Sequence, residues 1–377
     1  MKLALIHDYL NEFGGAERVL LALSEIWPRA PIYTAFYKKG SPAWQRFKDK
    51  DVRVSFAQKI PFFPGKLHSP LRFLAPKIWG SVAQELKDYD VVISSASWYV
   101  TKGFGVPIEI CYCHTPPRWL YGYPTSVEWQ KYWPVKVYGL VVGHFMRLYD
   151  YEAAQKVTYF IANSDNVKKR IAKFYRRDSQ VIYPPVDLGS SNQLLASSRK
   201  KDYYLVVSRI VGGKGLQLAV KTAVKHGLKL KVVGEAAGWG REFERLQKGV
   251  SRQARDKIKF MGRVDDEKLV KLYSQAKAFL ALATDEDFGM TPVEAMACGT
   301  GVVAYNGGGY RETILPGKTG VLFDNYSVEG LWQALKRFNN LNYLSVRKNC
   351  LDQARKFSKA RFKREMKEFV EEKVKKA

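Results

Sequence analysis

The apolar positions of the chain follow two alternating patterns. Short runs rich in Leu, Ile, Val and Ala are typical of buried strands, and the stretches between them carry apolar residues at helical spacing. Strands that alternate with helices form parallel sheets with right-handed crossovers, so the pattern predicts an α/β fold. The expected strands lie at residues 3–7, 90–94, 108–113, 159–162, 203–207, 229–233, 278–282 and 301–304.

The same local unit opens each half of the chain. Residues 3–27 and residues 203–224 both read as a strand, then a glycine-bearing loop, then a helix. A length of 377 residues is too great for one ordinary core and suits two domains. The sequence therefore predicts two Rossmann-like, doubly wound domains.

Composition shifts suggest where these domains begin and end. Pro184-Pro185 precedes a polar stretch at 189–201 that reads as a linker. We expect an N-terminal domain at 1–185 and a C-terminal domain at 186–357. Residues 358–377 should add an amphipathic helix. Its apolar face carries Phe362, Met366, Phe369, Val370 and Val374.

The chain is strongly basic, with a formal net charge of +26. Such an excess is compatible with nucleic acid, with an anionic membrane surface or with anionic substrates. The basic residues are spread over both halves, and the sequence contains no zinc-finger, RRM or helix-turn-helix signature. A basic nucleic-acid-binding protein is therefore the rival class, and we expect no nucleic-acid partner.

Residues 52–84 contain no Asp or Glu. Two interpretations of this segment stay open: a surface for an anionic membrane, or an ordinary packed segment with solvated lysines. Basic and aromatic residues interleave along it, namely Arg53, Phe56, Lys59, Phe62, Phe63, Lys66, Arg72, Phe73, Lys77 and Trp79.

The lack of a targeting signal and the low number of cysteines predict a cytoplasmic protein. No uncharged apolar run is long enough to span a membrane, and Asp8 interrupts the N-terminal apolar stretch before it could form a signal peptide. Four cysteines make a disulfide framework improbable. Cys111, Cys113 and His114 invite a metal interpretation, but the cysteines share one strand face and His114 leaves on the other, so buried strand cysteines are expected.

Two acidic residues flank a helix start after the strand at 278–282. Glu286 lies in the loop and Glu294 in the following helix, with seven residues between them. The backbone N–H groups of 289–291 would point from the helix N-terminus at an anion or at sugar hydroxyls. The two carboxylates can accept hydrogen bonds from such hydroxyls.

Two cations follow the first strand of the second half. Arg209 and Lys214 lie on the loop at 208–215 and would converge on a diphosphate. Because strand ends of a parallel sheet meet at the topological switch point, this loop and the Glu286 loop can face one ligand. A nucleoside diphosphate that carries a sugar fits both.

These features resemble the signature of the family-4 retaining glycosyltransferases of the GT-B fold. Glu286 and Glu294 are followed by Ala-Met-Ala-Cys-Gly299, as in that family. The resemblance is closest to the bacterial and archaeal mannosyltransferase branch. In chain order it also rests on Gly14-Gly15-Ala-Glu17, His114-Thr-Pro-Pro-Arg118, Ile161-Ala-Asn163-Ser164, Val181-Ile-Tyr-Pro-Pro-Val-Asp187, Arg209 with Lys214, and Gly262-Arg263-Val264.

The resemblance implies roles for matching residues. Arg209 and Lys214 would hold the donor diphosphate. Glu286 would contact hydroxyls of the donor sugar, and His114 would meet the transferring sugar. These four are the expected catalytic residues. The expected donor-binding residues are Gly14, Gly15, Arg263, Val264, Phe288, Gly289, Met290, Thr291 and Glu294, the last on the ribose hydroxyls.

The resemblance further implies two domains that face a cleft, with the C-terminal helix crossing back to the N-terminal domain. The implied reaction moves a hexosyl group, mannosyl from GDP-mannose above all, onto a glycan or lipid-linked acceptor. A UDP-sugar-dependent transferase and a nucleotide-sugar epimerase remain as alternatives. No metal or other cofactor is expected, because the two cations can neutralise the leaving diphosphate. We expect a cytoplasmic protein that can attach peripherally to the membrane.

Overall fold

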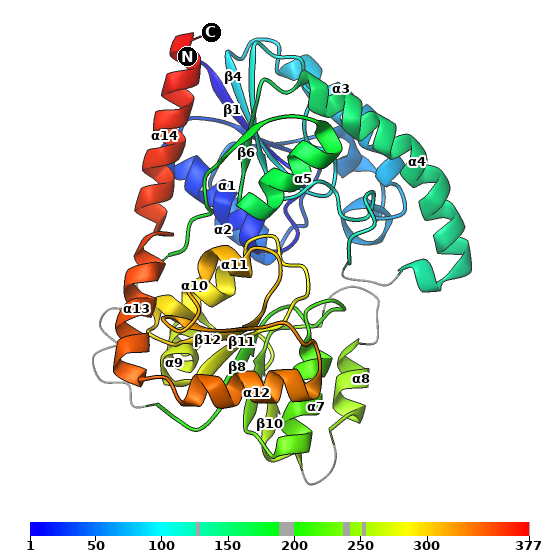
Figure 1. Cartoon of the computed structure of the whole chain (residues 1–377). Coiled ribbons are helices and arrows are strands. Elements are labelled where there is room, and N and C mark those ends of the chain that lie inside the picture. The colour runs from blue at the N-terminus through cyan, green and yellow to red at the C-terminus, as the bar shows by residue number, and fades with distance from the viewer. Residues whose placement is uncertain (126–128, 188–199, 237–241, 251–253, 377) are drawn as a thin grey trace. The chain divides into compact units, whose positions relative to one another are not determined.

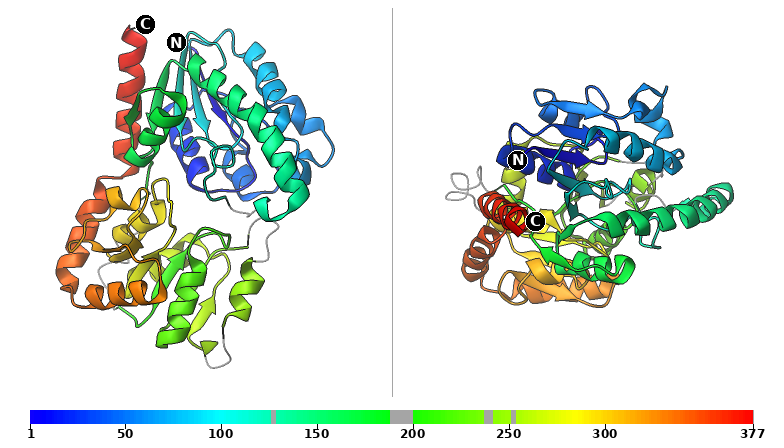
Figure 2. Two further views of the ribbon diagram at one scale, coloured as in Figure 1. Left: turned by 45° about the vertical axis from the view of Figure 1, so that its right-hand side comes forward. Right: turned by 90° about the horizontal axis from the view of Figure 1, so that it is seen from above.

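The computed structural model describes residues 1–125, 129–187, 200–236, 242–250 and 254–376. The chain forms two compact units (Figure 1, with two further views in Figure 2). The first contains residues 1–123, 129–185 and 359–377, and the second contains 124–128 and 186–358. Most of the expected linker at 189–201 lies outside the described residues.

A seven-stranded parallel sheet forms the centre of the first unit, in the order β3-β2-β1-β4-β5-β6-β7. The order reverses between β1 and β4, which is the topological switch point of a doubly wound sheet. Its strands are β1 Leu3–His7, β2 Ile32–Thr34, β3 Val52–Val54, β4 Val91–Ala96, β5 Ile108–Cys113, β6 Tyr159–Ala162 and β7 Ser179–Val181.

Helices and short helical turns complete the first unit. They are α1 Gly15–Ile26, α2 Pro42–Phe47, η1 Phe56–Lys59, η2 Phe63–Leu67, η3 Arg72–Leu74, α3 Ala75–Glu85, η4 Trp129–Lys131, α4 Trp133–Lys156, α5 Asp165–Tyr175 and α14 Lys359–Lys376. The C-terminal helix α14 packs beside α1 (Figure 1). Its apolar face, with Phe362 and Met366, is part of the core formed with α1 and β1. The predicted return of the C-terminal helix to the N-terminal unit is confirmed.

The second unit holds a six-stranded parallel sheet in the order β10-β9-β8-β11-β12-β13. Here the switch point lies between β8 and β11. Its strands are β8 Tyr204–Val207, β9 Leu230–Val233, β10 Ile258–Phe260, β11 Ala278–Ala281, β12 Val302–Tyr305 and β13 Gly320–Phe323. Its helices are α7 Leu216–His226, α8 Glu242–Lys248, α9 Asp266–Gln275, α10 Met290–Ala297, α11 Tyr310–Thr313, α12 Val328–Asn339 and α13 Tyr343–Arg355. Both doubly wound sheets confirm the predicted fold class.

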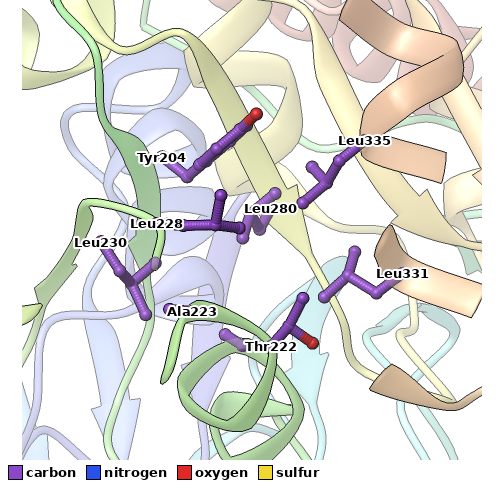
Figure 3. Close-up of a pocket in the computed structure, with 9 residues that line it drawn as sticks. Tyr204, Thr222, Ala223, Leu228, Leu230, Leu280, Leu331 and Leu335 are labelled. Atoms are coloured by element: carbon purple, nitrogen blue, oxygen red, sulfur yellow. The ribbon is translucent and has the colours of Figure 1, made fainter. Parts of the chain in front are cut away.

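Close packing of helices on the second sheet builds its core. Figure 3 shows Leu280 of β11, Thr222 of α7, and Leu331 and Leu335 of α12 around one gap. The gap that these apolar side chains line has no room for a water molecule. It is a packing contact within the core, and ligand chemistry has to be sought at the strand ends.

The fold confirms one expectation that lies outside the site. Cys111 and Cys113 are buried, unbridged and packed with Phe160, as expected for strand cysteines. Within the described part of the chain, the helices include none of the length and apolarity that a membrane span requires.

Candidate functional site

Glycine geometry brings two loops together at the switch point of the second unit. The loop after β8 ends at Gly215, which caps α7 with φ of 72°. A Cβ at this position would lie 2.2 Å from the carbonyl oxygen of Leu282, directly after β11. Because no side chain fits there, the loop carrying Lys214 can lie against the end of β11.

This approach pairs Lys214 with Glu286. The Lys214 Nζ lies 2.8 Å from Glu286 Oε2, and the two side chains are 31% and 20% exposed. The Tyr310 hydroxyl contacts the same oxygen at 3.5 Å. Burial, together with the charge of Glu286, raises the pKa of Tyr310, so this phenol stays a hydrogen-bond donor. Two of the predicted catalytic residues are therefore in direct contact.

A turn of three glycines supports the Glu286 loop from behind. Gly309 N donates to the carbonyl oxygen of Glu286 at 2.9 Å. A Cβ on Gly308 would lie 2.1 Å from that same oxygen. This turn at 307–309 was not among the predicted site residues, although three successive glycines after a strand are a visible signal of close backbone approach.

The start of α10 lies as predicted. Gly289 is its N-cap with φ of 90°, and Met290 and Thr291 form its first turn. A Cβ on Gly289 would lie 2.8 Å from the Tyr310 ring, so glycine is required here too. Phe288 is buried and packs edge-on against Phe357. The first N–H groups of the helix are thus held at the end of β11 beside Glu286.

Glu294 is fixed by a residue that the sequence analysis missed. Its Oε2 accepts a hydrogen bond from the Tyr273 hydroxyl at 2.8 Å. Tyr273 comes from α9 and is only 2% exposed. A buried tyrosine of this kind sets the direction of the carboxylate, because its hydroxyl can donate a hydrogen bond and the carboxylate can only accept one.

The strand ends on the other side of the switch point carry the remaining cations. The Ile210 N–H donates to the carbonyl oxygen of Glu235 and joins the segments that follow β8 and β9. The Gly234 N–H donates to the carbonyl oxygen of Gly262 and joins the segments that follow β9 and β10. Arg209 and Arg263 are exposed on these segments, and Val264 is half-buried. The structure therefore places Arg209 on the same loop as Lys214.

The expected residues of the first unit lie at its own switch point. Gly14 caps α1 and donates its N–H to Glu17 at 2.8 Å, and Gly15 opens the helix. His114 directly follows β5 and is 9% exposed. Its Nε2 lies 2.8 Å from the Ser95 hydroxyl of β4. The contact with Ser95 thus holds the His114 side chain at the carboxyl ends of β4 and β5.

The acidic triplet Asp285-Glu286-Asp287 has Asp-x-Asp spacing, which is used for metals in other proteins. In the structure Glu286 is instead bonded to Lys214. Across the residues described here, no three His, Cys, Asp or Glu side chains are grouped as metal ligands would be.

Two family models match adjoining parts of the chain. The model described as Glycosyltransferase Family 4 matches residues 13–190, and the one described as Glycosyl transferases group 1 matches residues 191–357. Together the two matched ranges include all the site residues described above in the first and the second unit.

Individual relatives are more distant. A D-inositol 3-phosphate glycosyltransferase from Segniliparus rotundus is 31% identical over 46% of this chain and 42% of its own length. The O-antigen chain mannosyltransferase RfbU from Salmonella typhimurium is 26% identical over 50% of this chain and 56% of its own. The chain thus spans about half the length of the curated relatives it matches.

Similarity of fold extends over the whole chain. The crystal structure of HepE from Anabaena, in complex with UDP and glucose, covers 98% of this chain and 99% of its own, with a TM-score of 0.73 and 20% identity. With two doubly wound sheets and both family models in chain order, this chain belongs to the family-4 glycosyltransferases of the GT-B fold.

Proposed function

We propose that the protein is a retaining glycosyltransferase that takes its hexosyl group from a nucleotide sugar, GDP-mannose in the first place. The observation that carries the proposal is the Lys214–Glu286 pair at the N-terminus of α10, with Arg209 on the same loop as Lys214. A diphosphate needs cations and oriented N–H groups, and a sugar needs carboxylates that accept from its hydroxyls. All of these groups gather at one switch point.

The proposed mechanism depends on the negative charge that develops on the leaving diphosphate. When the bond between the anomeric carbon and the phosphate oxygen breaks, negative charge grows on the diphosphate. Arg209 and Lys214 stabilise that charge where it develops. Retention by double displacement would need a free carboxylate nucleophile beneath the sugar. Glu286 is already bonded to Lys214 and is better suited to hold sugar hydroxyls, so the acceptor attacks on the face that the diphosphate leaves, and the phosphate takes its proton.

The donor assignment rests on relatedness. RfbU is named a mannosyltransferase, which favours GDP-mannose as donor and a glycan or lipid-linked saccharide as acceptor. HepE was solved with UDP and glucose, which keeps a UDP-sugar as the alternative. A panel of GDP- and UDP-sugars, assayed for released nucleoside diphosphate, separates the two. Release from GDP-mannose above all others supports the proposal, whereas consumption of a UDP-sugar without release of UDP indicates an epimerase.

A membrane-bound acceptor is supported by an exposed apolar face on α4. Exposed side chains recur along the helix at i, i+4 and i+7 spacing, which places them on one side. They are Trp133, Val137, Leu140, Val141, Phe145, Leu148 and Tyr151, of which Trp133 is 75% and Phe145 65% exposed. A contiguous apolar face of this size marks an interaction surface.

Charge favours an anionic lipid surface as the occupant of this face. Residues 131–149 contain no Asp or Glu, and Lys131 and Lys136 are exposed there. The Tyr138 hydroxyl donates to the carbonyl of Pro70, so α4 contacts the acid-free segment 52–84. We propose that α4 and this segment together hold the first unit on anionic lipid.

The packing interpretation of segment 52–84 holds for part of it, and the membrane interpretation is proposed for its exposed side chains. Phe63 and Trp79 are buried core residues, as the packing interpretation expects. Phe56, Phe62 and Phe73 are exposed. The Arg72 guanidinium stacks over the Trp119 ring instead of facing solvent. The exposed basic residues of the segment are Arg53, Lys59, Lys66 and Lys77.

A further inference from the structure

An arginine of the acid-free segment 52–84 is held firmly but has no carboxylate partner. Arg72 opens η3, and its side chain is half-buried. Its Nε donates to the Ser69 carbonyl at 2.8 Å, and its Nη2 donates to the Ser69 hydroxyl at 2.5 Å. The guanidinium carbon lies 4.5 Å from the centre of the Trp119 ring. In the described part of the chain, no carboxylate affects the pKa of this group, although charges removed from water are normally paired.

Tyrosines surround this arginine at the switch point of the first sheet. Burial lowers the pKa of Arg72, and the hydroxyls of Tyr99, Tyr9 and Tyr138 partly offset that effect. Tyr9 follows β1 and Tyr99 follows β4, which are the two strands at the switch point. Tyr138 belongs to α4, and its hydroxyl donates to the carbonyl of Pro70. Arg72 therefore lies close both to the sheet edge where ligands bind in such folds and to α4.

Two hydrogen-bond donors at this position have no acceptor. Neither Arg72 Nη1 nor the Tyr9 hydroxyl makes a hydrogen bond with the residues that the structure describes. Neither atom is among the fully enclosed polar atoms that lack a partner, so a ligand can reach both. Burial raises the pKa of Tyr9, so the phenol keeps its proton. Its ring stacks on Phe36 with the centroids 5.2 Å apart, which fixes the direction of the hydroxyl.

Arg177 of the same unit shows how an arginine with a purely structural role is bonded. It is also half-buried and also lies over an aromatic ring, that of Phe160. Its two terminal nitrogens donate to four backbone carbonyls between residues 154 and 158. Arg72 is held as firmly by Ser69 and Trp119, but one terminal nitrogen is unused. This difference favours a ligand for Arg72.

We infer that Arg72 and Tyr9 bind a phosphate group of the acceptor. The guanidinium offers planar N–H donors that match phosphate oxygens, and the Tyr9 hydroxyl adds a donor from the strand end. The surrounding aromatic rings exclude water, which strengthens a charge-assisted hydrogen bond. Because packing fixes both side chains before binding, little conformational entropy is lost.

The assignment of this phosphate to the acceptor rests on the proposed function, in which the donor diphosphate is bound by the second unit. A phosphate of this kind is carried either by a lipid or by a soluble sugar. Both carriers present the same oxygens to Arg72, and two binding assays distinguish them.

Calorimetric titration of the full chain with mannose 6-phosphate tests a soluble phosphate, with mannose as the uncharged comparison. Arg72→Gln should weaken phosphate binding about tenfold or more, since a charge-assisted hydrogen bond is lost. Tyr9→Phe keeps the ring on Phe36 and should weaken binding about threefold. Arg177→Gln is the matched control, and its affinity should equal that of the wild type.

Vesicle co-sedimentation tests a phosphate carried by a lipid. Phosphatidic acid exposes a phosphomonoester, whereas phosphatidylglycerol at the same mole fraction supplies anionic charge as a phosphodiester. With a lipid as the carrier, the wild type should prefer phosphatidic acid. Arg72→Gln and Tyr9→Phe should lose that preference, and Arg177→Gln should keep it.

The two assays have outcomes that decide the inference. Loss of phosphate binding in Arg72→Gln and Tyr9→Phe in either assay supports it and identifies the carrier. No phosphate-dependent binding by the wild type in both assays, or equal losses in Arg177→Gln, would overturn it. A loss in Lys214→Ala instead would assign the phosphate to the donor loop and would also overturn it. If no nucleotide sugar is turned over, the proposed function fails, whereas phosphate binding through Arg72 still stands.

Discussion

Lys214 and Glu286 illustrate how single residues in this site depend on each other. The lysine holds the carboxylate at 2.8 Å, and the carboxylate keeps the lysine beside the N-terminus of α10. Because both side chains are partly exposed, the pair contributes little to stability. In the proposed function, it would keep a cation and an acceptor in place before a ligand arrives.

Substitution of Lys214 should therefore affect turnover much more than folding. Lys214→Ala is expected to lose about 2–4 kcal/mol of transition-state stabilisation, which is a 30- to 1000-fold fall in kcat/KM. Release of nucleoside diphosphate measures it. Lys229→Ala, which removes another partly exposed lysine of the second unit that pairs with Asp202, is the matched control. Equal activity in Lys214→Ala and in the control would contradict the proposed contact between Lys214 and the diphosphate.

A buried carboxyl of the first unit makes stability depend on pH. Burial raises the pKa of Glu109 to about 7, against the opposing effect of the N–H groups of Phe104 and Gly103. The folded chain therefore holds this proton more tightly than the unfolded chain, whose carboxyl has the ordinary value of 4.5. As pH rises from about 4.5 through 7, the folded state loses up to about 3 kcal/mol from this group.

Glu109→Gln should remove that part of the pH dependence. A glutamine oxygen can still accept from the two N–H groups, but it does not ionise. Denaturant unfolding at pH 5 and pH 8 should show a smaller drop in the variant than in the wild type. Glu152→Gln, at an exposed position, should behave as wild type. Parallel pH profiles for Glu109→Gln and wild type would show that this carboxyl does not set the dependence.

Residue-level contacts were the part of the site that the sequence could reveal least. Glu286, Glu294 and Lys214 stand in recognisable local patterns. Their partners Tyr273 and Tyr310 lie 21 and 24 positions from the carboxylates they contact. Such contacts depend on which helices pack together at the end of a strand. The local spacing of residues in the sequence does not predict this packing.

At the scale of elements, the longer strands were predictable and the shortest were not. The eight expected strands are all present: three have the predicted ends, and the others differ by one or two residues at one or both ends. Four of the five missed strands have only three residues, too few to show a period, and the fifth, β13, has four and begins with a glycine. Thus β3, Val-Arg-Val, was absorbed into the basic segment 52–84. The apolar face of α4 was also not predicted. This helix buries apolar residues on its opposite side, so the sequence shows no single apolar stripe.

The α4 face can be tested by vesicle co-sedimentation. The wild type should bind phosphatidylglycerol-containing vesicles more tightly than pure phosphatidylcholine, and high salt should weaken the binding. Trp133→Ser with Phe145→Ser should lower binding at least about tenfold, since two large side chains no longer bury apolar area. Leu344→Ser in α13, which removes a 72% exposed leucine of the second unit, is the control. Indifference of the wild type to anionic vesicles at low salt would remove the membrane proposal.

At the scale of the whole molecule, the sequence anticipated more than at either smaller scale. Repetition of the strand–loop–helix pattern predicted two doubly wound sheets, and both are present. The switch point of the second sheet then located the Lys214 and Glu286 loops without knowledge of any contact, whereas the residues of the first unit were predicted from the family resemblance. The net charge of +26 remained ambiguous, because composition says nothing of where the charges lie.

We also expect turnover that needs no divalent cation. In the proposed donor site, Arg209 and Lys214 would supply the positive charge that a metal provides at other diphosphate sites, and Glu286 is bonded to Lys214. Nucleoside diphosphate release should persist in EDTA. Loss of activity in EDTA with recovery in Mg²⁺ or Mn²⁺ would mean that the triplet 285–287 binds a metal and that the charge neutralisation is misassigned.

The most direct test of the central claim follows the anomeric proton of the sugar by NMR. GDP-mannose carries an α-linked mannosyl group, and its slow cleavage by water needs no knowledge of the acceptor. At an enzyme concentration high enough for cleavage to outpace mutarotation, the first mannose released reports the stereochemistry of the reaction. We expect α-mannose first, together with GDP, and greatly reduced cleavage by Lys214→Ala. First-formed β-mannose, or cleavage that survives the loss of Lys214, would contradict a retaining transfer at this site.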